Sequence, residues 1–165
     1  MQLKRIAAAT AFFLAAGAQA NDIHWRHTFH LTQSAAFHGA DQSGHVLGAG
    51  EGTGLGLFSD NRVATMKLSY VVDFIDSEGP FTAYETYRFS DGSSLSVERT
   101  GTTTLDKQSG IATLSGKFRF TAGTGVYQGI HGGGSFLGKR LNPLAAGADQ
   151  YLDYSGQYEL DASHH

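Results

Sequence analysis

Residues 81–101 read FTAYETYRFSDGSSLSVERTG, and this stretch predicts a β-hairpin. Two runs with two-residue alternation flank Ser90-Asp91-Gly92, which suits a three-residue connection: a type I turn followed by glycine in the left-handed region. Such a turn sets the register of the two strands, so Tyr87 should face Leu95. We therefore expect the apolar side chains of both strands to share one face of the sheet.

Two charged side chains fall on that apolar face. The register places Glu85 there, and it places Arg99 at a diagonal position within reach of the carboxylate. We expect the two to form an ion pair inside the fold. Two interpretations stay open: a structural ion pair at one barrel mouth, which we favour because such pairs also perturb pKa values, and a ligand-binding or catalytic pair, which together with Tyr87 would form a catalytic set. In the catalytic set Glu85 is the acid or base, Arg99 its charge partner and Tyr87 a hydrogen-bond donor.

Two-residue alternation recurs along the chain, whereas helical periodicity is hard to find after residue 20. The clearest strand is 62–75, where apolar side chains alternate with polar ones such as Lys67 and Asp73. The other strands are expected at residues 23–32, 45–58, 81–89, 95–101, 111–120, 131–137 and 151–160. Because closure removes exposed strand edges, we favour an all-β, eight-stranded antiparallel closed β-barrel over a sandwich. Residues 142–150 lack alternation and should form a loop or a short helical turn.

Residues 120–136, FTAGTGVYQGIHGGGSF, are rich in glycine and raise the question of a phosphate-binding loop. The spacing is G-x-G-x-x-x-G, no helix can begin there, and Gly138-Lys139 is followed by arginine rather than by serine or threonine. These features argue against a nucleotide site. The glycines instead suit a turn with positive φ angles, followed by bulges or close contacts between strands.

The first twenty residues, MQLKRIAAATAFFLAAGAQA, have the pattern of a secretory signal peptide. Lys4 and Arg5 precede an apolar run that ends on Ala18-Gln19-Ala20. This run is shorter than the roughly 20 residues of a spanning helix, so no membrane span is expected. We predict cleavage after Ala20, a single barrel domain over residues 21–165, and a periplasmic or secreted location.

Composition narrows the class of partner. The chain has no cysteine, which excludes disulfides, thiolate metal sites and a catalytic thiol. The net charge is −3, and it becomes −5 when Lys4 and Arg5 are removed with the signal peptide. A negative net charge argues against nucleic acid or an anionic membrane as a binding partner. We expect a small apolar molecule as the partner.

The histidines near the mature N-terminus, HWRHTFH at 24–30, suggest zinc or copper at first sight. On an extended strand His24 and His30 share a face but lie roughly 20 Å apart. His27 points the other way, beside Trp25 and Phe29. We therefore favour surface or packing histidines and predict no metal site.

Three segments resemble the allene oxide cyclase barrel, whose superfamily includes the plant dirigent proteins. They are residues 83–101, 116–136 and 151–160. The most specific pieces are Gly123-Thr124-Gly125-x-Tyr127-x-Gly129, the tyrosine-rich strand before the turn at 90–92, and the Tyr-x-x-Tyr-x-Gly pattern that begins at Tyr151.

The resemblance implies an eight-stranded antiparallel barrel with a mostly apolar cavity, assembly as a dimer or trimer, and no metal or organic cofactor. Plant cyclases of this type direct ring closure of a fatty-acid epoxide, and dirigent proteins steer the coupling of phenoxy radicals. The plant cyclases have a glutamate on the first strand and a cysteine on a later one. Here residues 24–32 read HWRHTFHLT and cysteine is absent, so no catalytic residue carries over.

Three functions follow as hypotheses: a barrel that binds a small hydrophobic or aromatic molecule, an isomerase or cyclase that uses the same cavity, and a packed barrel that acts through its surface. Eight strands enclose a space that side chains fill or that holds one small ligand. Inward-facing aromatic residues are expected to line this space: Tyr70, Phe74, Phe89, Phe118, Phe120, Tyr154 and Tyr158.

Overall fold

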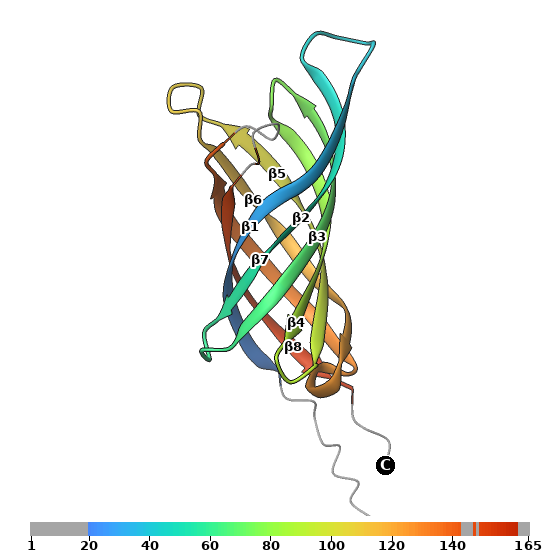
Figure 1. The fold of residues 1–165 in the computed structure, drawn as a ribbon, viewed down its shortest axis with the longest axis vertical. Coiled ribbons are helices and arrows are strands. Elements are labelled where there is room, and N and C mark those ends of the chain that lie inside the picture. Colours follow the sequence, from blue (N-terminus) through green and yellow to red (C-terminus); the bar gives the residue numbers. More distant parts are fainter. Residues whose placement is uncertain (1–19, 143–146, 148, 162–165) are drawn as a thin grey trace, which may run out of the picture.

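The computed structural model describes residues 20–142, 147 and 149–161, and it confirms the predicted fold class. Eight antiparallel strands close into a barrel in which each strand pairs with its neighbours in the sequence and the last pairs with the first (Figure 1). The elements are β1 (Asn21–His38), β2 (His45–Phe58), β3 (Val63–Ile75), β4 (Gly79–Phe89), β5 (Ser94–Leu105), β6 (Ala112–Thr124), the 3-10 turn η1 (Gly125–Tyr127), β7 (Ile130–Arg140) and β8 (Gln150–Leu160).

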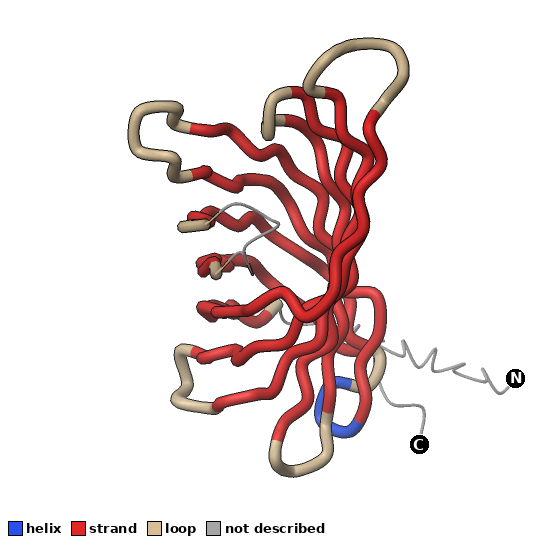
Figure 2. The backbone as a smooth tube through the Cα atoms, turned by 45° about the horizontal axis from the view of Figure 1, so that its top comes forward, coloured by secondary structure: helices blue, strands red, loops and turns tan. Residues whose placement is uncertain are grey.

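The eight predicted strands all exist, and the main differences are in length. The first was expected to end at residue 32, but β1 continues to His38 and pairs with β2 as far as Val46. The hairpin of β1 and β2 therefore reaches past the other strands at one end of the barrel (Figure 1), whereas η1 lies at the opposite end (Figure 2). We call these the long-hairpin end and the η1 end.

The hairpin of β4 and β5 has the predicted register. Tyr87 faces Leu95, and Ala83 faces Arg99. In the turn, the Phe89 amide donates to the Ser93 carbonyl at 2.9 Å, and Gly92 has a φ of +85°. Glycine adopts this left-handed conformation without the steric penalty of a Cβ atom. The turn therefore fixes which side chains of the two strands enter the barrel.

Alternation decides the inside and the outside of the barrel. In β3, buried residues such as Met66 and Leu68 alternate with exposed residues such as Thr65 and Lys67. Inward apolar side chains from all eight strands form one continuous hydrophobic core. Burial of apolar surface is the main favourable contribution to folding, so this alternation both selects the barrel and stabilises it.

The glycine-rich segment serves the barrel, in agreement with its predicted role. Gly125 and Gly129 have positive φ angles, +61° and +74°, around the 3-10 turn η1. Gly134 and Gly156 face each other across β7 and β8, and Phe118 packs against both: built Cβ atoms would lie 2.9 and 2.8 Å from its ring. The missing side chains therefore make room for an inward-facing aromatic ring.

Two predicted segments lie mainly outside the described residues: the signal peptide, apart from Ala20, and most of the loop at 142–150. Within the described ranges, no helix is both long enough and apolar enough to cross a membrane.

Candidate functional site

Five buried side chains from four strands meet inside the barrel, and we call them the polar cluster. Alternation turns each of them inward. They are His27 of β1, Glu85 and Tyr87 of β4, Arg99 of β5 and Tyr154 of β8, and none of these residues as a whole is more than 2% exposed. The three residues of the predicted catalytic set, Glu85, Tyr87 and Arg99, are thus brought together, although nothing in the geometry tests a catalytic role.

Glu85 is the centre of the polar cluster. Its Oε1 accepts a hydrogen bond from Arg99 Nε at 2.5 Å, and its Oε2 accepts one from the Tyr87 hydroxyl at 2.7 Å. The Tyr154 hydroxyl lies 3.1 and 3.0 Å from the two carboxylate oxygens. The carboxylate is therefore saturated with donors, as a buried charge requires.

These contacts keep Glu85 ionised. Burial alone would raise its pKa, but the nearby His27 imidazole, the charge of Arg99 and the hydrogen bond from the Tyr87 hydroxyl outweigh burial and lower the pKa from 4.5 to about 2. Burial and the neighbouring Glu85 charge raise the pKa of Tyr87 well above its usual value. The cluster therefore holds one carboxylate, one guanidinium and neutral tyrosines at neutral pH.

His27 connects to the carboxylate through Tyr87. Burial lowers the pKa of His27, so the imidazole is neutral near pH 7 and Arg99 supplies the positive charge beside Glu85. His27 Nδ1 lies 2.7 Å from the Tyr87 hydroxyl oxygen. Because that hydroxyl donates to Glu85, Nδ1 must carry the proton and donate to Tyr87.

Aromatic rings fill the barrel on the η1 side of the cluster. Trp25 stacks on Tyr154 with ring centroids 4.3 Å apart and on Phe58 at 5.6 Å, and the edge of Phe118 packs against it at 5.1 Å. Five of the residues predicted to line a cavity lie in this packed region: Phe89, Phe118, Phe120, Tyr154 and Tyr158. The aromatic content was thus an ambiguous signal, because rings that could border a cavity also fill one.

A cavity lies on the other side of the cluster, toward the long-hairpin end. Its volume is about 30 Å³. Tyr70 and Phe74, two further predicted residues, form part of its wall. The complete lining is Phe29, Leu31, Tyr70, Val72, Phe74, Phe81, Arg99, Thr103, Leu114, Arg140 and Gln150.

Polar atoms without partners mark this cavity. Arg99 Nη1, Thr103 Oγ1 and Gln150 Nε2 are buried and have no hydrogen-bond partner within the described part of the chain. Native proteins leave few buried polar groups unpaired, because each lost partner costs about 1 to 3 kcal/mol. Three such atoms around one cavity point to a bound molecule or ordered water as the missing partner.

Sequence reasoning found the ion pair but placed it wrongly at a barrel mouth. Both strands continue beyond the pair, β4 back to Gly79 and β5 on to Leu105, so Glu85 and Arg99 lie well inside the barrel. His27 was interpreted as a surface or packing residue, although its position between Trp25 and Phe29 did place it on the inward face. Alternation in their strands could have found three residues that were missed: Thr103, Arg140 and Gln150.

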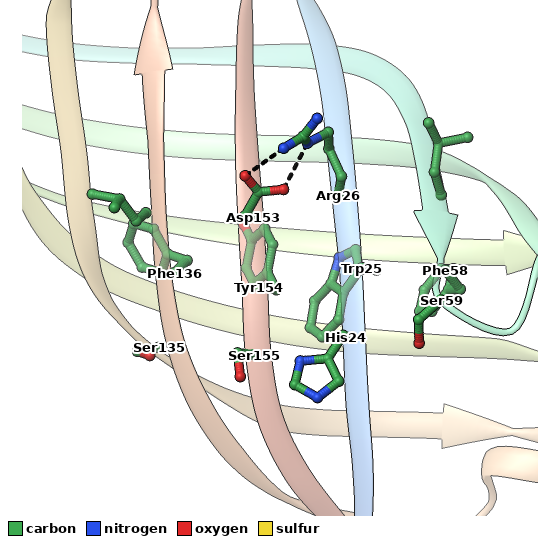
Figure 3. Close-up of a pocket in the computed structure, with 12 residues that line it drawn as sticks. His24, Trp25, Arg26, Phe58, Ser59, Ser135, Phe136, Asp153, Tyr154 and Ser155 are labelled. Carbon is green, nitrogen blue, oxygen red and sulfur yellow. Dashed lines mark hydrogen bonds and ion pairs between the residues drawn. The ribbon is translucent and has the colours of Figure 1, made fainter.

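The outer surface over β1 and β8 carries a shallow trough, bordered by His24, Arg26 and Asp153 (Figure 3). Arg26 Nε donates to Asp153 Oδ1 at 2.6 Å, and both side chains are about half exposed. Because these charged groups are already paired and hydrated, a ligand that contacted them would gain little binding free energy. Among the described residues, no group of three or more histidine, aspartate or glutamate side chains is arranged to hold a metal ion. We therefore place the candidate site in the interior cavity.

The fold and site define a closed, eight-stranded antiparallel barrel with a buried polar cluster below a small cavity. No protein-family model and no curated protein matches the sequence. Similar solved structures include the pterocarpan synthase dirigent proteins GePTS1 and PsPTS1, each 15% identical to this chain. The match to GePTS1 covers 96% of this chain and 98% of that one with a TM-score of 0.48, and the match to PsPTS1 covers 87% and 97% with a TM-score of 0.47.

Proposed function

We propose that the barrel binds a small molecule with an apolar body in the cavity beside the polar cluster. One observation carries this proposal: unpaired polar atoms of Arg99, Thr103 and Gln150 border a cavity whose other walls are mainly aliphatic and aromatic. Binding sites for small molecules combine an apolar lining with a few polar groups that orient the ligand. A ligand larger than one or two water molecules would need the walls of this cavity to move apart.

The alternative, an isomerase or cyclase that uses Glu85 as acid or base, has less support. The Glu85 carboxylate accepts hydrogen bonds from Tyr87, Arg99 and Tyr154, and the pKa of Glu85 is lowered to about 2. A general acid or base works best with a pKa near the operating pH and with access to the reacting atom. We therefore propose a structural role for the polar cluster: it holds Arg99 in place at the bottom of the cavity.

Native mass spectrometry of gently purified protein tests the binding proposal. We expect an added mass that is lost on denaturation. Val72→Phe should abolish the added mass because the larger ring enters the cavity, whereas Val71→Phe, on the exposed face of the same strand, should retain it. Added mass that survives Val72→Phe would refute the cavity as the site. A bare protein that binds no apolar molecule from a screen would favour a packed barrel that acts through its surface.

We also propose that the protein is exported to the periplasm or secreted, with cleavage after Ala20. In support, β1 begins at Asn21, so cleavage there removes no residue of the barrel. The intact mass of protein recovered from the periplasm or medium should correspond to a chain that starts at Asn21. Retention of residues 1–20 would contradict this proposal.

Self-association as a dimer or trimer is a further proposal. The outer face of β2 and β3 carries exposed apolar side chains, among them Leu55, Leu57, Val63 and Val71. Exposed apolar patches are common at protein interfaces. The native mass spectrum reports the assembly, and a monomer at micromolar concentration would contradict it.

A further inference from the structure

Arg140, the last residue of β7, is a buried cation without an anionic partner. Its side chain lines the cavity, and the residue is 5% exposed. No carboxylate lies within 4.0 Å of it among the described residues. The undescribed segments contain no aspartate or glutamate, so all the aspartate and glutamate side chains of the protein belong to the described residues.

The surroundings of Arg140 compensate its charge poorly. Its guanidinium carbon lies 6.0 Å from the centre of the Phe74 ring, at the outer limit of a cation–π contact. Burial lowers its pKa, and only the nearby Tyr70 acts in the opposite direction. Arg99, in contrast, has Glu85 as a partner and lies 5.0 Å from the Phe81 ring. A buried charge without partners is costly, so Arg140 is poised to gain from an anion.

The balance of buried charges indicates how much negative charge the cavity takes. Of the described residues, the buried charged side chains are Glu85, Arg99 and Arg140, which together carry a net charge of +1. One monoanion would neutralise this set, whereas a dianion such as hydrogen phosphate would leave an excess of negative charge. The apolar wall also favours a ligand with little polar surface beyond its anionic group.

Further donors surround the same space. Gln150 pairs with Arg140 across β7 and β8, and its Nε2 lacks a partner. Thr103 Oγ1 and Arg99 Nη1 also lack partners and border the cavity. A guanidinium, an amide and a hydroxyl are hydrogen-bond donors, and a planar guanidinium matches the two oxygens of a carboxylate.

We propose that the ligand of this barrel is a small carboxylate with an apolar body, whose anionic group pairs with Arg140 inside the cavity. This inference rests on the proposed binding function and adds the chemical class of the ligand. Gln150, Thr103 and Arg99 would donate to the remaining lone pairs of the carboxylate, and the apolar body would lie against the aliphatic and aromatic wall.

The test compares carboxylates with neutral amides of the same shape. Benzoate and benzamide form one pair of probes, and butyrate and butyramide form a second, smaller pair. Binding to the mature wild-type protein is measured by isothermal titration in a buffer without carboxylates, with inorganic phosphate as a third probe. We expect at least one carboxylate to bind about tenfold or more tightly than its amide, because only the carboxylate forms charge-assisted hydrogen bonds with the Arg140 guanidinium. Phosphate should bind more weakly than that carboxylate.

Two variants assign the preference to one side chain. Arg140→Gln should abolish the preference for the carboxylate, while Lys139→Gln, which removes the same charge from the neighbouring outward position, should leave it unchanged. Equal binding of acid and amide would overturn the inference but leave the proposed binding function in place. Binding of none of the probes, together with a bare native mass, would overturn both. A preference that survives Arg140→Gln, or tighter binding of phosphate, would also overturn the inference.

Discussion

Arg99 Nε donates a hydrogen bond to Glu85 Oε1 across 2.5 Å, and the two side chains are 3% and 0% exposed. The pair joins β4 to β5 inside the barrel. Arg99 lies directly opposite Ala83 in the sheet, so Glu85, two residues further along β4, is its diagonal neighbour. Water does not screen an interaction at this depth, so its loss should be costly.

Glu85→Gln should therefore destabilise the protein strongly. The substitution keeps the shape of the side chain but leaves Arg99 buried without its counter-charge, and breaking a buried pair costs about 3 to 5 kcal/mol. Denaturation by urea, followed by tryptophan fluorescence of Trp25, measures the free energy of unfolding. A double variant, Glu85→Gln with Arg99→Met, should recover part of the loss because no unpaired charge remains.

The matched control for this substitution is Asp153→Asn, which breaks the exposed ion pair with Arg26. Water screens that pair, so we expect a much smaller effect on the midpoint of denaturation. Equal effects of Glu85→Gln and Asp153→Asn would show that the buried pair contributes no more than a surface pair.

Stability should fall on acidification below about pH 4.5. Glu85 has a pKa of about 2 in the folded protein and about 4.5 when unfolded, so its contribution is complete above pH 4.5 and disappears as the pH falls toward 2. A shift of this size corresponds to about 3 kcal/mol. Urea midpoints between pH 7 and pH 2 measure the effect, and the slope in this range should be smaller in Glu85→Gln. An identical slope in both proteins would rule out Glu85 as its source.

His27 should make the stability of the fold depend on pH in a second, higher range. Burial lowers the pKa of His27 below 6.5, so the unfolded chain binds a proton that the folded protein excludes, and stability decreases as the pH falls below 6.5. His45 acts in the opposite sense because hydrogen bonds to Asp41 and Asp73 raise its pKa. His27→Gln isolates the first effect. The variant should gain stability relative to the wild type between pH 7 and pH 5, and a constant difference would contradict a neutral His27.

The fold could be predicted because its signals are local. Turn sequences such as 90–92 and alternation such as that in 62–75 act over a few residues, and together they specify strand order and inward faces. The length of β1 could not be predicted in this way. Residues 33–38 read QSAAFH and carry no alternation of their own; they are extended because β2 provides backbone partners for them.

The site was predicted in part, because its members come from strands far apart in the sequence. The hairpin turn sets the register that brings Glu85 near Arg99, and local reasoning could find it. His27 and Tyr154 join the same carboxylate only when the barrel closes between β1 and β8. Arg140 and Gln150 were missed for another reason: charged and amide side chains at strand ends are usually exposed, and here they are buried.

Thr103→Val should make the ligand-free protein more stable. The Thr103 hydroxyl is fully buried and unpaired in the cavity wall, and valine replaces it with a methyl group of similar size. Removal of an unsatisfied buried polar group should raise the free energy of unfolding by about 1 kcal/mol or more. Thr104→Val, at the adjacent exposed position, is the control and should change little. A loss of stability in Thr103→Val would show that ordered water already satisfies the hydroxyl.

Gly134→Ala should destabilise the barrel through strand separation. A Cβ atom at this position would lie 2.1 Å from the Ser155 carbonyl oxygen and 2.9 Å from the Phe118 ring. Neither neighbour can give way without moving β7 from β8 or displacing the ring, and overpacking of this kind costs about 1 to 3 kcal/mol. Hydrogen exchange should therefore become faster at the amides that join the two strands.

Gly110→Ala provides the comparison, because no atom lies within 4 Å of its built Cβ and only its φ of +72° opposes alanine. A residue with a side chain in that conformation costs about 1 to 2 kcal/mol, without effect on β7 and β8. We expect Gly110→Ala to lower the free energy of unfolding while the amides that join β7 and β8 exchange hydrogen as slowly, relative to the other amides, as in the wild type. If Gly134→Ala left exchange at the β7–β8 amides unchanged, the glycine-rich segment would have a function other than seating Phe118.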